Sequence, residues 1–99
     1  RVMAYARSEA ATLAAQYPGF PEDAFRHVMW SYLLTLHFGP DFAEQVTDAH
    51  ETLPGNTPAE REMDFKNNAF GRRLALENAS VEELMDAVLN SPQVIRRYD

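Results

Sequence analysis

Apolar residues recur at helical spacing along most of the chain, and no alternating apolar–polar run is long enough to predict a β-strand. Proline and glycine pairs interrupt this pattern, and each pair is expected to separate two helices. The predicted helices cover residues 2–17, 21–38, 41–53, 57–78 and a short segment that begins after Ser80. A last turn is expected to dock through Val94, Ile95 and Tyr98. The pattern therefore predicts an all-α fold, a compact single-domain bundle of five or six helices over residues 1–99.

The helix at 57–78 has the most informative polar pattern. Thr57 and Glu60 form a capping box with Pro58 at the first helical position, so the helix is expected to begin there. One polar face contains Glu62, Lys66 and Arg73. A second polar strip contains Glu60, Asp64, Asn67, Asn68 and Gly71. This strip lies between two apolar rows, namely Met63, Phe70 and Leu74 on one side and Phe65, Ala69 and Leu76 on the other.

A polar strip framed by apolar rows differs from an ordinary amphipathic helix, which has one polar face. Two acids and two amides in this position suggest that the strip lines a cleft between helices. The alternative is a network of caps and core hydrogen bonds, because buried polar groups in proteins are usually satisfied by internal partners.

The helix at 21–38 is apolar almost all round, which is typical of the buried centre of a small bundle. Asp23, His27 and Trp30 share one face of it. His27 is thus expected to lie in apolar surroundings with a carboxylate one turn earlier, an arrangement that can fix the imidazole tautomer. The alternative is a purely structural core histidine.

In the helix at 41–53, the spacing predicts that Phe42, Val46, Ala49 and Leu53 face the core. His50 falls at the margin of this face, where a side chain can reach a cleft. Its neighbour Glu51 is expected to turn further outward.

Three helices therefore carry polar groups at inward or marginal positions, and their convergence would permit metal chemistry. His27, His50 and Asp64 can hold a divalent metal ion through two imidazoles and one carboxylate, which leaves a coordination position for water. The two histidines belong to different helices, so their spacing does not form a recognised metal motif. A metal cofactor stays one of two alternatives.

The second alternative is acid–base chemistry without a metal. Here His27 or Glu51 acts as general base, and Arg26 stabilises developing negative charge together with the amides of Asn67 and Asn68. Neither a glycine-rich phosphate loop nor a GxSxG nucleophile motif is found in the sequence.

The amino-acid composition argues against several classes of binding partner and site. Fifteen acids against nine bases give a formal net charge of −6, which argues against a nucleic-acid surface because phosphate binding needs clustered Lys and Arg. No apolar run approaches the ~18 residues of a membrane-spanning helix. The absence of cysteine excludes disulfides and thiolate metal sites. The chain begins at Arg1 rather than Met, so it is expected to be one domain of a longer protein.

Three segments taken together resemble a bacterial domain family. They are DAFRHVMW at 23–30, DAHE at 48–51 and EREMDFKNNAFGRR at 60–73, and they are similar in order and spacing to the pattern DAxRHxxW, AHE and ExxMDxxNNxxGR. Such domains resemble C-terminal toxin modules of large secreted proteins, including Rhs-type and other polymorphic toxins. The resemblance covers residues 19–73. The sequence departs from the pattern at Phe65-Lys66, where a small apolar residue and a polar or histidine residue are expected.

The net charge of −6 disfavours nuclease action, so by elimination the expected reaction is hydrolysis of a cell-envelope substrate such as phospholipid or peptidoglycan. The resemblance implies an antibacterial effector that is secreted and delivered into a target cell. It also implies a cognate immunity protein as partner. The catalytic candidates are His27, His50, Glu51 and Asp64. The substrate-binding candidates are Arg26, Trp30, Glu60, Asn67 and Asn68, and Gly71 is expected to leave room for the substrate. The alternative is a non-enzymatic helical binding module whose polar residues form a structural network.

Overall fold

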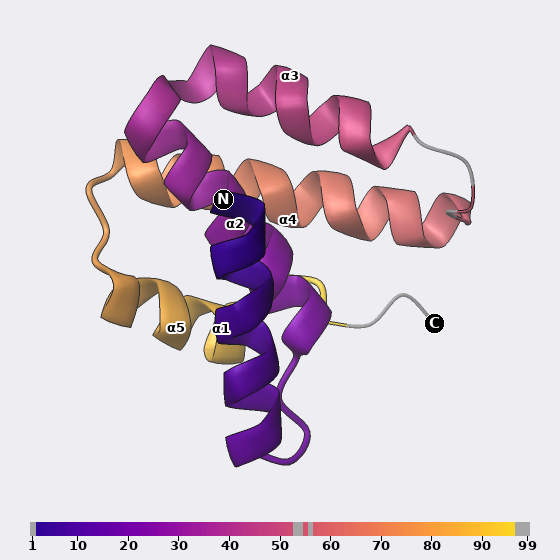
Figure 1. The fold of residues 1–99 in the computed structure, drawn as a ribbon, viewed down its shortest axis with the longest axis vertical. Coiled ribbons are helices and arrows are strands. Elements are labelled where there is room, and N and C mark those ends of the chain that lie inside the picture. The colour runs from indigo at the N-terminus through magenta and orange to yellow at the C-terminus, as the bar shows by residue number, and fades with distance from the viewer. Residues whose placement is uncertain (1, 53–54, 56, 97–99) are drawn as a thin grey trace.

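The computed structural model describes residues 2–52, 55 and 57–96, and these residues form five α-helices and no strand (Figure 1). The helices are α1 (Val2–Gln16), α2 (Glu22–Phe38), α3 (Pro40–Glu51), α4 (Pro58–Leu76) and α5 (Val81–Asn90). The predicted all-α class is thereby confirmed. Residues 91–96 form turns and bends rather than a sixth helix. Val94 is buried there, whereas Tyr98 lies outside the described residues.

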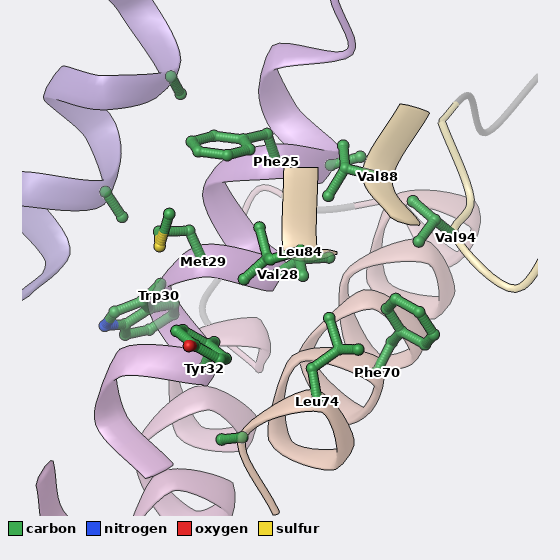
Figure 2. Close-up of a cluster of buried hydrophobic side chains, with 14 of the residues drawn as sticks. Phe25, Val28, Met29, Trp30, Tyr32, Phe70, Leu74, Leu84, Val88 and Val94 are labelled. Atoms are coloured by element: carbon green, nitrogen blue, oxygen red, sulfur yellow. The ribbon is translucent and has the colours of Figure 1, made fainter. Parts of the chain in front are cut away.

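Helix α2 is the centre of the bundle, because it packs against each of the other four helices (Figure 1). Its apolar side chains, including Phe25, Val28 and Met29, meet Leu74 of α4 and Leu84 of α5 in one buried cluster (Figure 2). The radius of gyration of 12.4 Å agrees with the value of about 13 Å for a compact domain of about 100 residues. None of the described helices combines the length and apolar character needed to cross a membrane.

Capping boxes begin both helices of the C-terminal half, as the sequence predicts. The Thr57 hydroxyl accepts from the Glu60 backbone N–H at 3.1 Å, and the Glu60 carboxylate accepts from the Thr57 N–H at 2.9 Å. Ser80 and Glu83 repeat this exchange at the start of α5 at 3.1 and 2.7 Å. Both first turns therefore have partners for backbone donors that would otherwise be unsatisfied.

The prediction of which face of α3 points toward the core is wrong. Phe42 is 47% exposed and Ala49 is also exposed, whereas the buried residues of α3 are Ala43, Thr47 and Glu51. The polar members of this face, Thr47 and Glu51, can be buried because they form hydrogen bonds with other groups in the fold. Hydrophobic periodicity does not reveal such partners. Val46 packs at the edge of the core, and Leu53 lies outside the described residues.

Four of the five residues in the polar strip of α4 turn inward as expected. Asp64, Asn67, Asn68 and Gly71 are buried, together with the apolar row of Met63, Phe70 and Leu74, whereas Glu60 at the start of the helix is only partly buried. The opposite apolar row is not buried in the same way: Phe65 is half-buried, Ala69 is exposed and Leu76 is 60% exposed. Helix α4 packs against α2 and α3, so the strip itself faces the interior and the second row turns toward solvent.

Candidate functional site

His27 lies in the second turn of α2 and is the centre of the polar cluster. Its Nδ1 atom lies 3.0 Å from the backbone carbonyl oxygen of Asp23, one helical turn earlier, and the Asp23 carboxylate is further away at 3.8 Å. The carbonyl therefore accepts a hydrogen bond from Nδ1–H and orients the ring. Asp23 is thus the partner of His27 as predicted, but the backbone of Asp23 lies closer to the ring than its side chain does.

The other ring nitrogen of His27 faces two carboxylates that come from two other helices. Nε2 lies 3.4 Å from Oε2 of Glu51, the last residue of α3, and 3.5 Å from Oδ2 of Asp64 in α4. Both distances are longer than the range of about 2.7–3.2 Å for an ordinary N–H···O hydrogen bond, and both are within the range of an ion pair. The exposed fractions of the three side chains are 5%, 0% and 9%, so solvent screens their charges weakly.

Glu51 is the residue that connects the cluster. Its Oε2 atom accepts a hydrogen bond from Nδ2 of Asn68 at 3.1 Å and lies 3.6 Å from Nδ1 of His50. The carboxyl group of Asp64 lies next to that of Glu51, since both face the same nitrogen of His27. The prediction that Glu51 turns outward is thus wrong, because four polar residues from three helices surround its carboxylate and allow it to be fully buried.

The two carboxyl groups differ strongly in acidity. Burial alone would raise the pKa of Glu51, but hydrogen bonds with His27, Asp64 and Asn68 lower this pKa to about 2. Burial raises the pKa of Asp64 to about 7, and the bond to Glu51 adds to the rise although the charge of His27 opposes it. Burial lowers the pKa of His27, but Glu51, the Asp23 carbonyl and the charge of Asp64 together raise it above its ordinary value. Near neutral pH, Asp64 can both give and take a proton.

Trp30 and His50 lie side by side at the edge of the cluster, and His50 is the one that reaches solvent. The Trp30 ring lies edge-on to both imidazoles, with centroids 5.1 Å from His50 and 6.4 Å from His27. Trp30 is buried, whereas the His50 side chain is 40% exposed. A ligand would therefore reach the cluster from the His50 side.

Three buried polar atoms in the described part of the chain have no hydrogen-bond partner, and all three belong to this cluster. They are His50 Nδ1, Asp64 Oδ1 and Asn68 Oδ1. An unmade hydrogen bond of a buried group costs about 1–3 kcal/mol, and native proteins contain few of them. Their gathering around Glu51 indicates a place where a ligand would complete the bonding.

Two groups of side chains have donor atoms close enough together for a metal ion. In one group, single donor atoms of His27, His50 and Glu51 lie within 4.8 Å of one another, and the same limit holds for Asp23, His27 and Asp64 in the other. The metal set predicted from the sequence was His27, His50 and Asp64. In the structure all three lie in the cluster, but His50 groups with His27 and Glu51, whereas Asp64 groups with His27 and Asp23.

Other predicted site residues have structural partners. Arg26 forms an ion pair with Asp23 at the rim, where its side chain is 33% exposed. The carboxylate of Glu60 caps the start of α4, as described above. The Asn67 amide donates to the Ile95 carbonyl at 2.8 Å and accepts from the Ile95 N–H at 2.9 Å, so it binds backbone rather than a ligand.

Gly71 leaves room for protein rather than for substrate. A Cβ atom at this position would meet the backbone of Val28 in α2. The expectation that Gly71 opens space for a ligand is corrected accordingly: the space is filled by the neighbouring helix.

The buried hydroxyl groups of Ser31 and Thr47, which the sequence did not assign to the site, also have hydrogen-bond partners within the bundle. The Ser31 hydroxyl donates to the Asn68 carbonyl oxygen at 2.6 Å, and the Thr47 hydroxyl donates to the Ala43 carbonyl oxygen at 2.9 Å. Arg72 donates to the Thr47 hydroxyl oxygen at 3.3 Å. A small polar residue in an otherwise apolar helix was the available signal for Ser31, whereas nothing in the sequence indicated the partner of Arg72.

Surface cavities of about 510, 440 and 340 Å³ are lined by residues outside the cluster. The first lies between α4 and residues 92–95, the second beside residues 17–20 and α5, and the third between α1 and α2. The polar cluster lies apart from these three cavities, where α2, α3 and α4 meet.

These features define a class of protein: a small all-α domain with a buried histidine–carboxylate cluster between three helices. Residues 2–94 match the family described as the domain of unknown function DUF6973, and the chain belongs to that family. A search of curated proteins found no match, and a search of solved structures found none either.

Proposed function

We propose that this domain is an antibacterial effector that hydrolyses a component of the target-cell envelope. The main support is the position of the His27 Nε2 atom, which faces the carboxylates of Glu51 and Asp64 at 3.4 and 3.5 Å inside the bundle. Burying three ionisable groups costs free energy unless they are paired. Clusters of buried ionisable groups with shifted pKa values occur preferentially at functional sites. The similarity of its three motifs to polymorphic-toxin modules supports the biological role.

Asp64 is the proposed general base of the reaction. Its Oδ1 atom is free to accept a proton from water, while Oδ2 faces His27. The water oxygen would attack the substrate, its proton would pass to Asp64, and the same proton would then return to the leaving group. Glu51 would hold His27 and Asn68 in position through the contacts described above. Arg26, at the rim, would bind an anionic group of the substrate.

The substrate class follows from charge and from the toxin resemblance. The net charge of −6 disfavours nucleic acid, and phospholipid or peptidoglycan and its precursors are the envelope components that we propose. The producing cell would need an immunity protein. A basic surface on that protein would complement the acidic domain.

The test is toxicity of the domain in a bacterial host, with export to the periplasm compared with retention in the cytoplasm. We expect Asp64→Asn and His27→Gln each to abolish toxicity while the far-ultraviolet circular dichroism of the purified proteins stays unchanged. Glu62→Gln is the matched control, because Glu62 lies on the same helix and its side chain is 65% exposed. Full toxicity of either site variant would overturn the assignment.

A structural network is the second candidate, and the packing roles of Asn67, Gly71 and Ser31 favour it. In that case the buried cluster is a latch between α2, α3 and α4 in a binding module. His27→Gln would then lower the melting temperature by several degrees, and any loss of function would follow the folded fraction. Loss of toxicity at a temperature where the variant is fully folded would support the catalytic role and contradict the purely structural one.

A further inference from the structure

We propose that His27, His50 and Glu51 form a binding site for zinc or a similar divalent transition metal. Two imidazoles and one carboxylate are a known catalytic zinc set that leaves a coordination position open. The three residues come from the second turn of α2 and the last turn of α3, so the packing of two helices brings them together.

The distances between the donor atoms fit this metal. Zinc bonds of about 2.0–2.2 Å at tetrahedral angles place neighbouring ligand atoms about 3.3–3.6 Å apart. Glu51 Oε2 lies 3.4 Å from His27 Nε2 and 3.6 Å from His50 Nδ1. One donor atom of each residue falls within 4.8 Å of the others, so only small side-chain movements would be needed.

The surroundings of these atoms also resemble those of a metal centre. A metal-binding histidine usually donates its other ring N–H to a carbonyl or carboxylate. His27 does this through the Asp23 carbonyl at 3.0 Å, which leaves Nε2 for the metal. Glu51 Oε2 is held from outside by the Asn68 amide at 3.1 Å.

The unpartnered atoms give independent support. Asp64 and Asn68 are 6% and 0% exposed, and Oδ1 of each lacks a hydrogen-bond partner within the described residues. Both atoms are acceptors, and water bound to a metal is a strong donor. His50 Nδ1 is unpartnered as well, as expected of a ligand atom before the metal binds. The partly exposed His50 ring provides the entry path.

The experiment is titration of the chelator-treated protein with Zn²⁺ by calorimetry. We expect one ion per chain, and His50→Gln should weaken binding by at least about 100-fold, since even loss of an outer-shell partner costs 10–100-fold. His37→Gln is the matched control, because His37 lies in the last turn of α2 and lines a different cavity. This control should bind zinc like the unchanged chain.

A second measurement covers the case in which a variant folds poorly. Co²⁺ in a four-coordinate site with nitrogen and oxygen ligands absorbs visible light, so the unchanged chain should show this absorption when Co²⁺ is added. The single variants Glu51→Gln and His50→Gln should each alter the spectrum. No zinc binding by the unchanged chain, or equal affinity of the chain and His50→Gln, would overturn the proposal. Metal binding is measured without a toxicity assay, so the metal site and the toxin role can fail separately.

Discussion

Gly71 of α4 and Val28 of α2 are so close that a Cβ atom on Gly71 would lie 2.3 Å from the Val28 carbonyl oxygen. Real Cβ atoms do not approach a backbone oxygen this closely, so only glycine fits here. His27 directly precedes Val28, and Asn68 lies three residues before Gly71 on the facing helix. The same helix crossing therefore sets the distance from His27 to the polar strip of α4.

We expect Gly71→Ala to destabilise the domain by about 1–3 kcal/mol or more, because the added methyl group meets backbone that must move as a unit. This direction is unusual, since replacing glycine by alanine inside a helix ordinarily stabilises a protein by about 0.5–1 kcal/mol. Denaturation with urea, monitored by circular dichroism, measures the difference.

The control for this change is Ala69→Gly, two residues earlier on the exposed face of α4. It should cost only the helix propensity of about 1 kcal/mol. A Gly71→Ala protein that is more stable than the unchanged chain would show that α2 and α4 do not approach at this point.

Asn67→Ala should release the segment after α5. The Asn67 side chain makes two hydrogen bonds with the Ile95 backbone, at 2.8 and 2.9 Å, and no other described contact of Ile95 replaces them. We expect the Ile95 amide to exchange with deuterium much faster in the variant. The loss in stability should be about 1–3 kcal/mol, the cost of leaving partly buried backbone groups unpaired.

The matched change is Asn90→Ala, because the Asn90 amide donates to the exposed Asp86 carboxylate at 3.0 Å within α5. It should leave exchange at Ile95 unaltered. Unchanged exchange at Ile95 in the Asn67 variant would contradict the assigned clamp, and it would return Asn67 to the list of possible substrate ligands.

Much of the fold could be predicted from local chemistry. Capping residues determine where a helix begins, so Thr57 and Ser80 located the starts of α4 and α5. The apolar middle of α2 indicated its central position, because a helix that is apolar almost all round is usually buried. The face of α3 could not be predicted, because hydrophobic periodicity assigns a carboxylate to solvent. Glu51 is buried by partners on α2 and α4 that no local pattern shows.

The candidate site was predictable in its residues but not in its geometry. His27, His50, Glu51 and Asp64 do come together, and their residue types suggested this. The roles of Asn67 and Gly71 could not be assigned, because a buried amide or a glycine in a helix serves a ligand and a neighbouring backbone equally well. Only the positions of Ile95 and Val28 decide between these uses.

The stability of the metal-free domain should fall as the pH rises from about 4 to 7. Burial raises the pKa of Asp64 from 3.8 to about 7, so in this range the folded state holds a proton that the unfolded chain has released. The raised pKa of His27 acts in the same direction above 6.5, since its contribution is lost as the pH rises through the folded-state value. The lowered pKa of Glu51 stabilises the fold above about 4.5, and this stabilisation is lost as the pH falls toward about 2.

These three groups place maximum stability at about pH 4–5 rather than at neutral pH. Urea denaturation in the presence of a chelator, repeated from pH 3 to pH 8, should show this maximum. One proton gives a slope of at most about 1.4 kcal/mol per pH unit. Asp64→Asn cannot titrate and should remove most of the fall between about pH 4 and 7, whereas Glu62→Gln on the exposed face of α4 should keep it. Equal slopes in the Asp64 variant and the unchanged chain would mean that Asp64 ionises in the folded protein as it does in the unfolded one.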